Sequence, residues 1–261
     1  MRILVTGASG VLGMAVYSAF KSAGHTILGL AHSRATDELK KVDLLNQVET
    51  EGVFTEFKPD WVIHCAAERR PDVAEKDPER ARRLNALVPR HLAQLSKSLK
   101  YMLIYISTDY VFDGTSPPYT PSSPTHPVNH YGETKRDGEV ALMEVGASRN
   151  VVLRVPVLYG PAPNNSDTAV NILIDVVADQ SGKKYNMDHY ATRFPTNVVD
   201  IAEFLVRLSE RPASSPIPPI LHYSAPEPFT KYEMCLIFSK ILGLPHEHIV
   251  PDANAPTVCA L

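Results

Sequence analysis

The chain has few cysteines, no excess of one charge and no long hydrophobic run, and each absence excludes a class of protein. Its three cysteines, Cys65, Cys235 and Cys259, are odd in number and far apart, which argues for reduced thiols rather than a disulfide framework. With 26 basic and 29 acidic side chains, the formal charge of −3 predicts no nucleic-acid or anionic-membrane partner. No apolar run approaches a membrane span, and strand residues begin too early for a signal peptide. We therefore expect a cytoplasmic protein.

Hydrophobic residues, by contrast, are plentiful enough for a large core. They make up 44% of the 261 residues, and apolar runs alternate with helical patterns as in βαβ units on a parallel sheet. Strands are expected at 2–6, 26–31, 61–65, 102–107 and 151–155. This pattern predicts an α/β fold of the Rossmann type, a doubly wound parallel sheet. We expect a nucleotide-binding domain over 1–155 and a smaller substrate-side lobe over 156–261.

Local signals predict further elements along the chain. Asp77-Pro78 has the form of a helix start, and the apolar residues after it follow helical spacing as far as Leu95. Thr230 is an expected cap for a helix that ends at Gly243. The other elements predicted after residue 155 are helices over 168–180 and 198–210 and a strand over 220–224.

The first predicted strand runs directly into a Gly-x-x-Gly-x-x-Gly turn and a helix. Gly7 permits the tight turn, Gly10 lets backbone N–H groups approach a pyrophosphate, and Gly13 allows close packing of the helix on the sheet. The helix directs its positive N-terminal end at that pyrophosphate. Because a strand precedes the glycines and a helix follows, the turn predicts dinucleotide binding.

The end of the second predicted strand indicates which dinucleotide binds. An NAD site would place Asp or Glu there to grip the 2′-hydroxyl of the adenosine ribose. This chain instead has His32, Ser33 and Arg34, and a hydroxyl with a guanidinium suits a 2′-phosphate, so NADP(H) is expected. The alternative is that Arg34 is an ordinary surface arginine. Asp43 and Leu44 are placed to meet the adenine edge.

The third predicted strand ends in small residues followed by an arginine pair. Cys65, Ala66 and Ala67 allow the backbone to pass close to the pyrophosphate and ribose. Arg69 and Arg70 come next, at the edge of the sheet where ligands bind, and favour phosphate or partner contact over a helix-capping or surface pair. His64, within the strand, is interpreted as a hydrogen-bonded core residue.

Two further segments carry residues for a reaction at a carbonyl or alcohol. Tyr131 and Lys135 lie on one face of a predicted helix, where the ammonium favours phenolate over phenol and can also hold the nicotinamide ribose. Thr108, at the end of the fourth predicted strand, supplies a hydroxyl to orient the substrate oxygen during hydride transfer. A surface helix that carries the tyrosine and lysine by chance is the alternative.

These segments, taken in order, resemble the extended short-chain dehydrogenase/reductases. Similarity to dTDP-4-dehydrorhamnose reductase is found in residues 107–114, 131–135, 138–139 and 193–197. A narrower resemblance is to the regulatory, or beta, subunits of methionine adenosyltransferase. It rests on residues 64–73, 186–189, 193–196 and 230–234.

The narrower resemblance implies a reductase fold that binds NADP(H) and acts chiefly by associating with the catalytic subunit that makes S-adenosylmethionine. It also implies residue roles. The pyrophosphate would be cradled by Ser9, Gly10, Val11 and Leu12, and the adenosine phosphate would face His32, Ser33 and Arg34. The rest of the cofactor path would be lined by Asp43, Leu44, Cys65, Arg69, Tyr131 and Leu158. Leu158 also fits by position, because it follows the last strand of the nucleotide domain and can abut the nicotinamide.

Three functions remain open. The first is a regulatory, NADP-binding subunit of methionine adenosyltransferase, favoured by residues 68–72. The second is an NADPH-dependent reductase of a nucleotide-linked 4-keto sugar, with Thr108, Tyr131 and Lys135 as the catalytic set. Tyr131 and Lys135 do not separate the two, because both also contact the cofactor. The third, a redox sensor that binds NADP(H) and changes partner affinity, merges with the first.

The last residues differ from the pattern of the narrower family. Its members continue with an arginine- and proline-containing strip and a tail that contacts the catalytic subunit. Residues 251–261 do not resemble that tail, so association with the catalytic subunit is left open, and a truncated or alternative product is expected. His246 and His248 lack a third ligand of suitable spacing, and no metal site is predicted.

Overall fold

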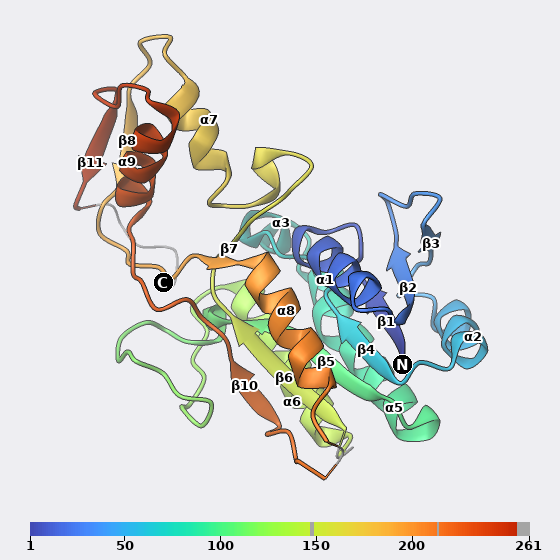
Figure 1. The fold of residues 1–261 in the computed structure, drawn as a ribbon. Coiled ribbons are helices and arrows are strands. Elements are labelled where there is room, and N and C mark those ends of the chain that lie inside the picture. Colours follow the sequence, from blue (N-terminus) through green and yellow to red (C-terminus); the bar gives the residue numbers. More distant parts are fainter. Residues whose placement is uncertain (147–148, 213, 255–261) are drawn as a thin grey trace.

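The computed structural model describes residues 1–146, 149–212 and 214–254. Within these residues, seven parallel strands form one sheet in the order β10-β6-β5-β4-β1-β2-β3 (Figure 1). The strands are β1 Arg2–Thr6, β2 Thr26–Ala31, β3 Leu39–Lys41, β4 Trp61–His64, β5 Met102–Thr108, β6 Asn150–Val155 and β10 Ile220–His222. The chain extends the sheet from β1 through β2 and β3, then returns to the other side of β1 with β4. This is the doubly wound fold that the sequence predicts.

Helices cover both faces of the sheet, because alternate strand residues point to opposite sides. In β1, Ile3 and Val5 face one layer and Leu4 faces the other, and all three are fully buried. The layer over Ile3 contains α1 Val11–Ser22 and α8 Val198–Ser209. The opposite layer contains α2 Gln47–Phe57, α5 Val88–Leu99 and α6 His130–Glu144. The glycine turn thus leads into α1 at one edge of a well-packed core.

The helix predicted from Asp77 is broken into pieces. The Asp77 side chain does accept the Arg80 N–H, which confirms the cap. Beyond it the structure has α4 Pro78–Arg82, a π-helical turn Arg83–Leu87 and then α5. Pro89 explains the break, because it has no N–H to offer the Asn85 carbonyl. That carbonyl instead accepts the Tyr105 hydroxyl at 2.9 Å.

The other predicted elements agree closely with the structure, but the sequence analysis missed one longer helix, α2, and several short elements. Thr230 caps α9 Lys231–Leu242 in a capping box with Glu233, and Gly243 ends the helix with a φ of 65°. The predicted helix over 168–180 is shorter, as α7 Ile172–Ala178. Besides β3 and α2, the sequence did not indicate α3 Pro71–Lys76, β7 Leu158–Tyr159, β8 Tyr185–Asp188, β9 Thr196–Asn197, β11 Ile249–Asp252 or the 3-10 turns Asp109–Val111 and Asn165–Asp167.

A small lobe stands beyond the sheet in Figure 1, formed by α7, α9, β8 and β11. Its own core contains Leu173, Val177, Met187, Cys235 and Ile249, all buried. By contrast, α8 and β10, which also follow residue 155, pack on the sheet or extend it.

Two further properties of the described residues concern disulfide bonds and membrane-spanning helices. Cys65 and Cys235 are free thiols, whereas Cys259 lies outside the described residues. Within 1–146, 149–212 and 214–254, no helix combines the length and the apolar character needed to cross a membrane.

Candidate functional site

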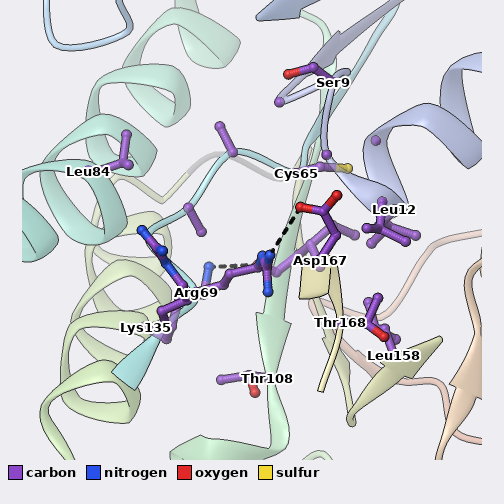
Figure 2. A pocket seen from close by; sticks show the side chains of 18 of the residues that line it. Ser9, Leu12, Cys65, Arg69, Leu84, Thr108, Lys135, Leu158, Asp167 and Thr168 are labelled. Carbon is purple, nitrogen blue, oxygen red and sulfur yellow. Dashed lines mark hydrogen bonds and ion pairs between the residues drawn. The ribbon is translucent and has the colours of Figure 1, made fainter. Parts of the chain in front are cut away.

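A cleft of about 800 Å³ lies at the carboxyl ends of the strands, between the sheet and the small lobe (Figure 2). Every residue predicted for the site lines it: Gly7, Ser9, Gly10, Val11, Leu12, Gly13, His32, Ser33, Arg34, Asp43, Leu44, Cys65, Ala66, Ala67, Arg69, Thr108, Tyr131, Lys135 and Leu158. In doubly wound sheets, ligands bind in the crevice where the strand order reverses. The structure brings these residues together at that position.

The glycine turn is packed so tightly that side chains are excluded. Gly7 has a φ of +65°, and a Cβ there would lie 2.7 Å from the Ala66 nitrogen. A Cβ on Gly13 would lie 2.1 Å from the Gly7 carbonyl oxygen, closer than any real contact. The Gly10 N–H donates to Gly7 at 2.9 Å, which closes the turn. The arrangement fits a dinucleotide, because the helix N-terminus meets open space that no side chain occupies.

The segment after β4 is held in place by a buried asparagine. Asn85, in the π-helical turn, donates to the Glu68 carbonyl and accepts the Glu68 N–H, both at 2.9 Å. Its amide also donates to Thr134 in α6 at 3.0 Å. These bonds fix the backbone that presents Arg69 to the cleft. His64 is buried and shares a 2.6 Å hydrogen bond with Thr6, which confirms its interpretation as a core residue.

Arg34 does reach the cleft, and there it meets an acidic side chain that the sequence did not indicate. Its Nη1 donates to the Asp167 Oδ1 at 3.0 Å, and the Arg69 Nη2 lies 3.8 Å from the same oxygen. Asp167 comes from the small lobe, so the ion pairs cross the cleft. No local pattern reveals such a pair, because Arg34 and Asp167 are separated by 133 positions.

The three residues of the expected catalytic set all line the cleft. Burial raises the pKa of Tyr131 to about 12, although a hydrogen bond with Thr108 opposes the rise. The Lys135 ammonium is directed elsewhere, donating to the Ile106 carbonyl at 2.8 Å and lying 4.0 Å from the centre of the Tyr105 ring. The role expected for Lys135 toward the phenol stays a prediction, and with a pKa of about 12 Tyr131 is a neutral phenol near pH 7.

Two ionisable groups beside Tyr131 have pKa values near neutrality. Burial lowers the pKa of Lys135 to about 7, against the attraction of the Glu139 carboxylate. Burial raises the pKa of Asp109 to about 7, although Thr108 donates a hydrogen bond to it at 3.1 Å. Asp109 also lines the cleft, and the sequence analysis did not assign it a role. Such displaced values are typical of functional sites.

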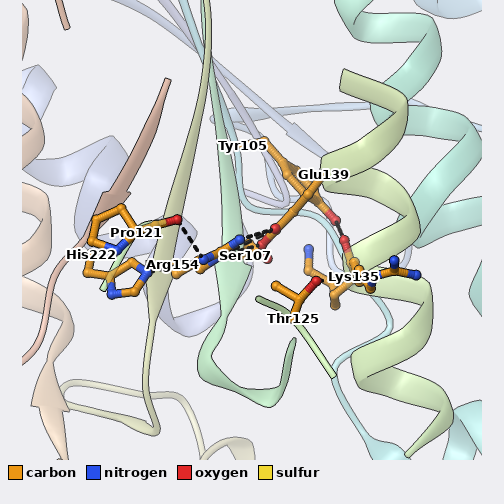
Figure 3. A network of polar contacts seen from close by, with 9 residues as sticks. Tyr105, Ser107, Pro121, Thr125, Lys135, Glu139, Arg154 and His222 are labelled. Carbon is orange, nitrogen blue, oxygen red and sulfur yellow. Dashed lines mark hydrogen bonds and ion pairs between the residues drawn. The ribbon is translucent and has the colours of Figure 1, made fainter. Parts of the chain in front are cut away.

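A buried ion pair lies next to the cleft residues Ser107 and Lys135 (Figure 3). Arg154 donates to Glu139 through two nitrogens, at 3.0 and 2.7 Å, and both side chains are nearly fully buried. Ser107 donates to the same carboxylate from β5. Arg154 also contacts His222 of β10 at 3.3 Å. The network thus joins β5, β6, β10 and α6, with every charge compensated.

Among the residues that the structure describes, no group of three or more histidine, cysteine or acidic side chains could hold a metal ion. The His248 Nε2 donates to the Val176 carbonyl at 2.9 Å.

The sequence of the whole chain is similar to known protein families and relatives. The family model of the RmlD substrate binding domain matches residues 1–258. Methionine adenosyltransferase 2 subunit beta from Xenopus laevis is 44% identical over 256 residues, which are 98% of this chain and 76% of the relative. The chain belongs to the methionine adenosyltransferase beta-subunit branch of the RmlD family.

Other, more distant relatives are named as reductases. The dTDP-4-keto-6-deoxy-D-glucose reductase of Streptomyces niveus is 29% identical over 249 residues, covering 93% of this chain and 79% of the relative. Among solved structures, dTDP-4-dehydrorhamnose reductase from Bacillus anthracis, in complex with NADP, matches with a TM-score of 0.84 and 25% identity. That match covers 97% of this chain and 85% of the reductase. Both the regulatory and the reductase hypotheses therefore have relatives in the RmlD family.

Proposed function

We propose that this protein binds NADP(H) in the cleft and serves in the cytoplasm as a regulatory beta subunit that modulates S-adenosylmethionine synthesis by a methionine adenosyltransferase. The observation that carries the proposal is the 44% identity with the Xenopus laevis beta subunit across 98% of this chain. Two free thiols in the described residues suit a reducing compartment. Fold alone transfers function poorly, so the similarity over both lobes matters most.

The cleft supports NADP(H) as the coenzyme. The glycine turn would hold the pyrophosphate at the N-terminus of α1, and Ser33 with Arg34 would bind the 2′-phosphate. Cys65, Arg69 and Leu158 would line the path toward the nicotinamide. When bound, the coenzyme would supply or accept a hydride. The NADP complex of the Bacillus anthracis reductase, which has the same fold, supports this assignment.

Substitution of Arg34 tests the coenzyme assignment. Arg34→Ala should weaken NADP binding by one or two charge-assisted contacts, about 1.5–3 kcal/mol each, and leave NAD binding nearly unchanged. Isothermal titration calorimetry with both coenzymes measures the difference. Arg207→Ala is a matched control, because that arginine is exposed, lies outside the cleft lining and pairs with Glu203 of its own helix. Equal losses of NADP and NAD affinity would mean that Arg34 does not touch the 2′-phosphate.

The subunit proposal is tested with the catalytic subunit of methionine adenosyltransferase 2. Analytical ultracentrifugation of the mixed proteins should give a complex heavier than either component, and the rate of S-adenosylmethionine formation should change when this protein is added. Both measurements are made with and without NADP. If the two proteins sediment separately and the rate is unaffected, the proposed role is wrong.

A reductase activity on a dTDP-linked 4-keto sugar is the second candidate, favoured by the presence of Thr108, Tyr131 and Lys135 in one cleft. The neutral Tyr131 phenol would donate a proton to the carbonyl oxygen, with Thr108 orienting that oxygen. Incubation with NADPH and dTDP-4-dehydrorhamnose should then reduce NADPH absorbance, and Tyr131→Phe should abolish the loss. If the unaltered protein and Tyr131→Phe oxidise NADPH equally slowly, this candidate is excluded.

A further inference from the structure

The small lobe contributes one acidic side chain to the cleft, directly against the arginines of the nucleotide side (Figure 2). The Asp167 Oδ1 lies 3.0 Å from the Arg34 Nη1 and 3.8 Å from the Arg69 Nη2. The Asp167 side chain is only 14% exposed, whereas those of Arg34 and Arg69 are 46% and 48% exposed. A mostly buried carboxylate therefore forms ion pairs with two guanidiniums that are otherwise exposed to the cleft.

The Asp167 side chain is held in place by a hydrogen bond within its own turn. Its second oxygen, Oδ2, accepts the Asn164 N–H at 3.2 Å, which closes the turn Asn165–Asp167. The neighbouring Asn165 donates to Asp175 of α7 at 2.6 Å. Although partial burial acts in the opposite direction, the hydrogen bond and charge of Arg34 lower the pKa of Asp167. The carboxylate is thus held as an anion at a defined place.

The same guanidinium is the one assigned above to the 2′-phosphate of NADP(H). A phosphate monoester carries about −1.5 to −2 charges at pH 7. Bound at Arg34, it would lie close to the Asp167 carboxylate that already pairs with the Arg34 guanidinium. Two anions near one guanidinium repel each other, and the Arg34–Asp167 bond must loosen when a 2′-phosphate binds. NAD has a hydroxyl at this position and does not need Arg34.

We propose that Asp167 sets the coenzyme selectivity of the cleft, by competing with the 2′-phosphate for Arg34 and so moderating the preference for NADP over NAD. This inference rests on the proposed NADP(H) site. Without a coenzyme, the small lobe supplies its own anion to the arginines. A 2′-phosphorylated dinucleotide replaces that anion, whereas NAD binds beside it.

The test compares NADP and NAD binding to the unaltered full chain, Asp167→Asn, Arg34→Ala and the double variant, by calorimetry at one ionic strength. Asp167→Asn keeps a hydrogen-bonding oxygen but removes the charge. It should tighten NADP binding by ~3- to 10-fold and change NAD binding by less than about twofold. In the Arg34→Ala background the selective gain should be clearly smaller, because the competition for Arg34 is gone and only the direct repulsion between carboxylate and phosphate remains. Glu144→Gln is the control. Glu144 forms an ion pair with Arg90 at 2.6 Å, and this pair lies outside the cleft lining.

Several results would overturn the inference while leaving the NADP(H) site intact. One is an Asp167→Asn variant with unchanged NADP affinity, and another is a variant that binds NADP selectively more weakly. A third is a variant that alters the affinity for both coenzymes equally, as a purely structural lesion would. The last is a selective gain that is equally large in the Arg34→Ala background. Failure of the unaltered protein to bind NADP at all would instead overturn the proposed coenzyme site, and this inference with it.

Discussion

At the scale of single residues, burial determines which protons the cleft can exchange. Near pH 7, Tyr131 is a neutral phenol, whereas Lys135 and Asp109 both have pKa values of about 7. The residue types and their order predicted Tyr131 and Lys135 as a pair, and both line the cleft. Their ionisation was not predictable, because it depends on burial in the folded protein, which raises the pKa of Tyr131 and lowers that of Lys135.

The displaced pKa of Asp109 predicts how stability varies with pH. In the unfolded chain Asp109 ionises near pH ~3.9, whereas in the folded protein burial raises its pKa to about 7. Between these values the unfolded state releases its proton first, so the wild-type protein loses stability as pH rises from about 4 to 7. Asp109→Asn does not titrate and should gain stability relative to wild type across this range, on the order of 3 kcal/mol.

Urea unfolding of both proteins at the two ends of that range measures the effect of Asp109. The difference between their free energies of unfolding should grow in favour of the variant as pH rises. A difference that stays constant with pH would show that Asp109 ionises normally in the folded protein.

At the scale of elements, the chain follows its local signals until a distant group competes for a backbone bond. The strand, glycine turn and helix α1 form as predicted, as does the capped helix α9. The helix after Asp77 is interrupted because Pro89 frees the Asn85 carbonyl and the hydroxyl of Tyr105, in β5, bonds to it. Short elements such as β3 were missed, since Leu39–Lys41 has too few apolar residues to show a period.

The space around two helical glycines, one in α1 and one in α2, predicts opposite effects of Gly→Ala substitution on stability. Gly13→Ala places a methyl group 2.1 Å from the Gly7 carbonyl oxygen, and should cost about 1–3 kcal/mol and distort the coenzyme turn. Gly52→Ala, in α2, meets nothing within 4 Å and should stabilise the protein by about 0.5–1 kcal/mol. Denaturant titration measures both, and NADP binding should be lost only in Gly13→Ala. Similar stability and binding in the two variants would contradict the tight packing.

The Arg154–Glu139 pair predicts a large energetic effect where β6 meets α6. Glu139→Gln leaves the Arg154 guanidinium buried without a counter-charge, which should cost about 3–5 kcal/mol of unfolding free energy. Glu203→Gln, which breaks an exposed pair with Arg207, should cost about 0–0.5 kcal/mol. Chemical denaturation distinguishes the two. A small loss in Glu139→Gln would mean that water reaches Arg154.

At the scale of the whole molecule, the cleft depends on both parts of the chain. Leu158, Asp167 and Thr168, from the second part, line it together with the glycine turn and the end of β2. The doubly wound parallel sheet could be predicted from the alternating pattern, but β3 and the place of β10 as the outer strand could not. That strand is only Ile220–His222, and it gains its place by pairing with β6.

Because the cleft joins both parts, NADP should stabilise them together. At a concentration of 100 times its dissociation constant, NADP should add about 2.7 kcal/mol to the free energy of unfolding. Scanning calorimetry should show a single transition that moves upward with NADP, and a smaller shift for Arg34→Ala at the same concentration. Two transitions of which NADP moves only one would contradict a coenzyme held across the cleft.

The sequence by itself determined the doubly wound core and the glycine turn, because each depends on hydrogen bonds and apolar spacing within a short stretch of chain. It also predicted many, but not all, of the residues that line the cleft. Only the tertiary structure decided the partner of Arg34, the neutral state of Tyr131 and the break before α5. Each of these depends on a group far away in the chain, such as Asp167, 133 positions beyond Arg34. Burial and ion pairing arise between elements, and no local pattern encodes which elements will meet.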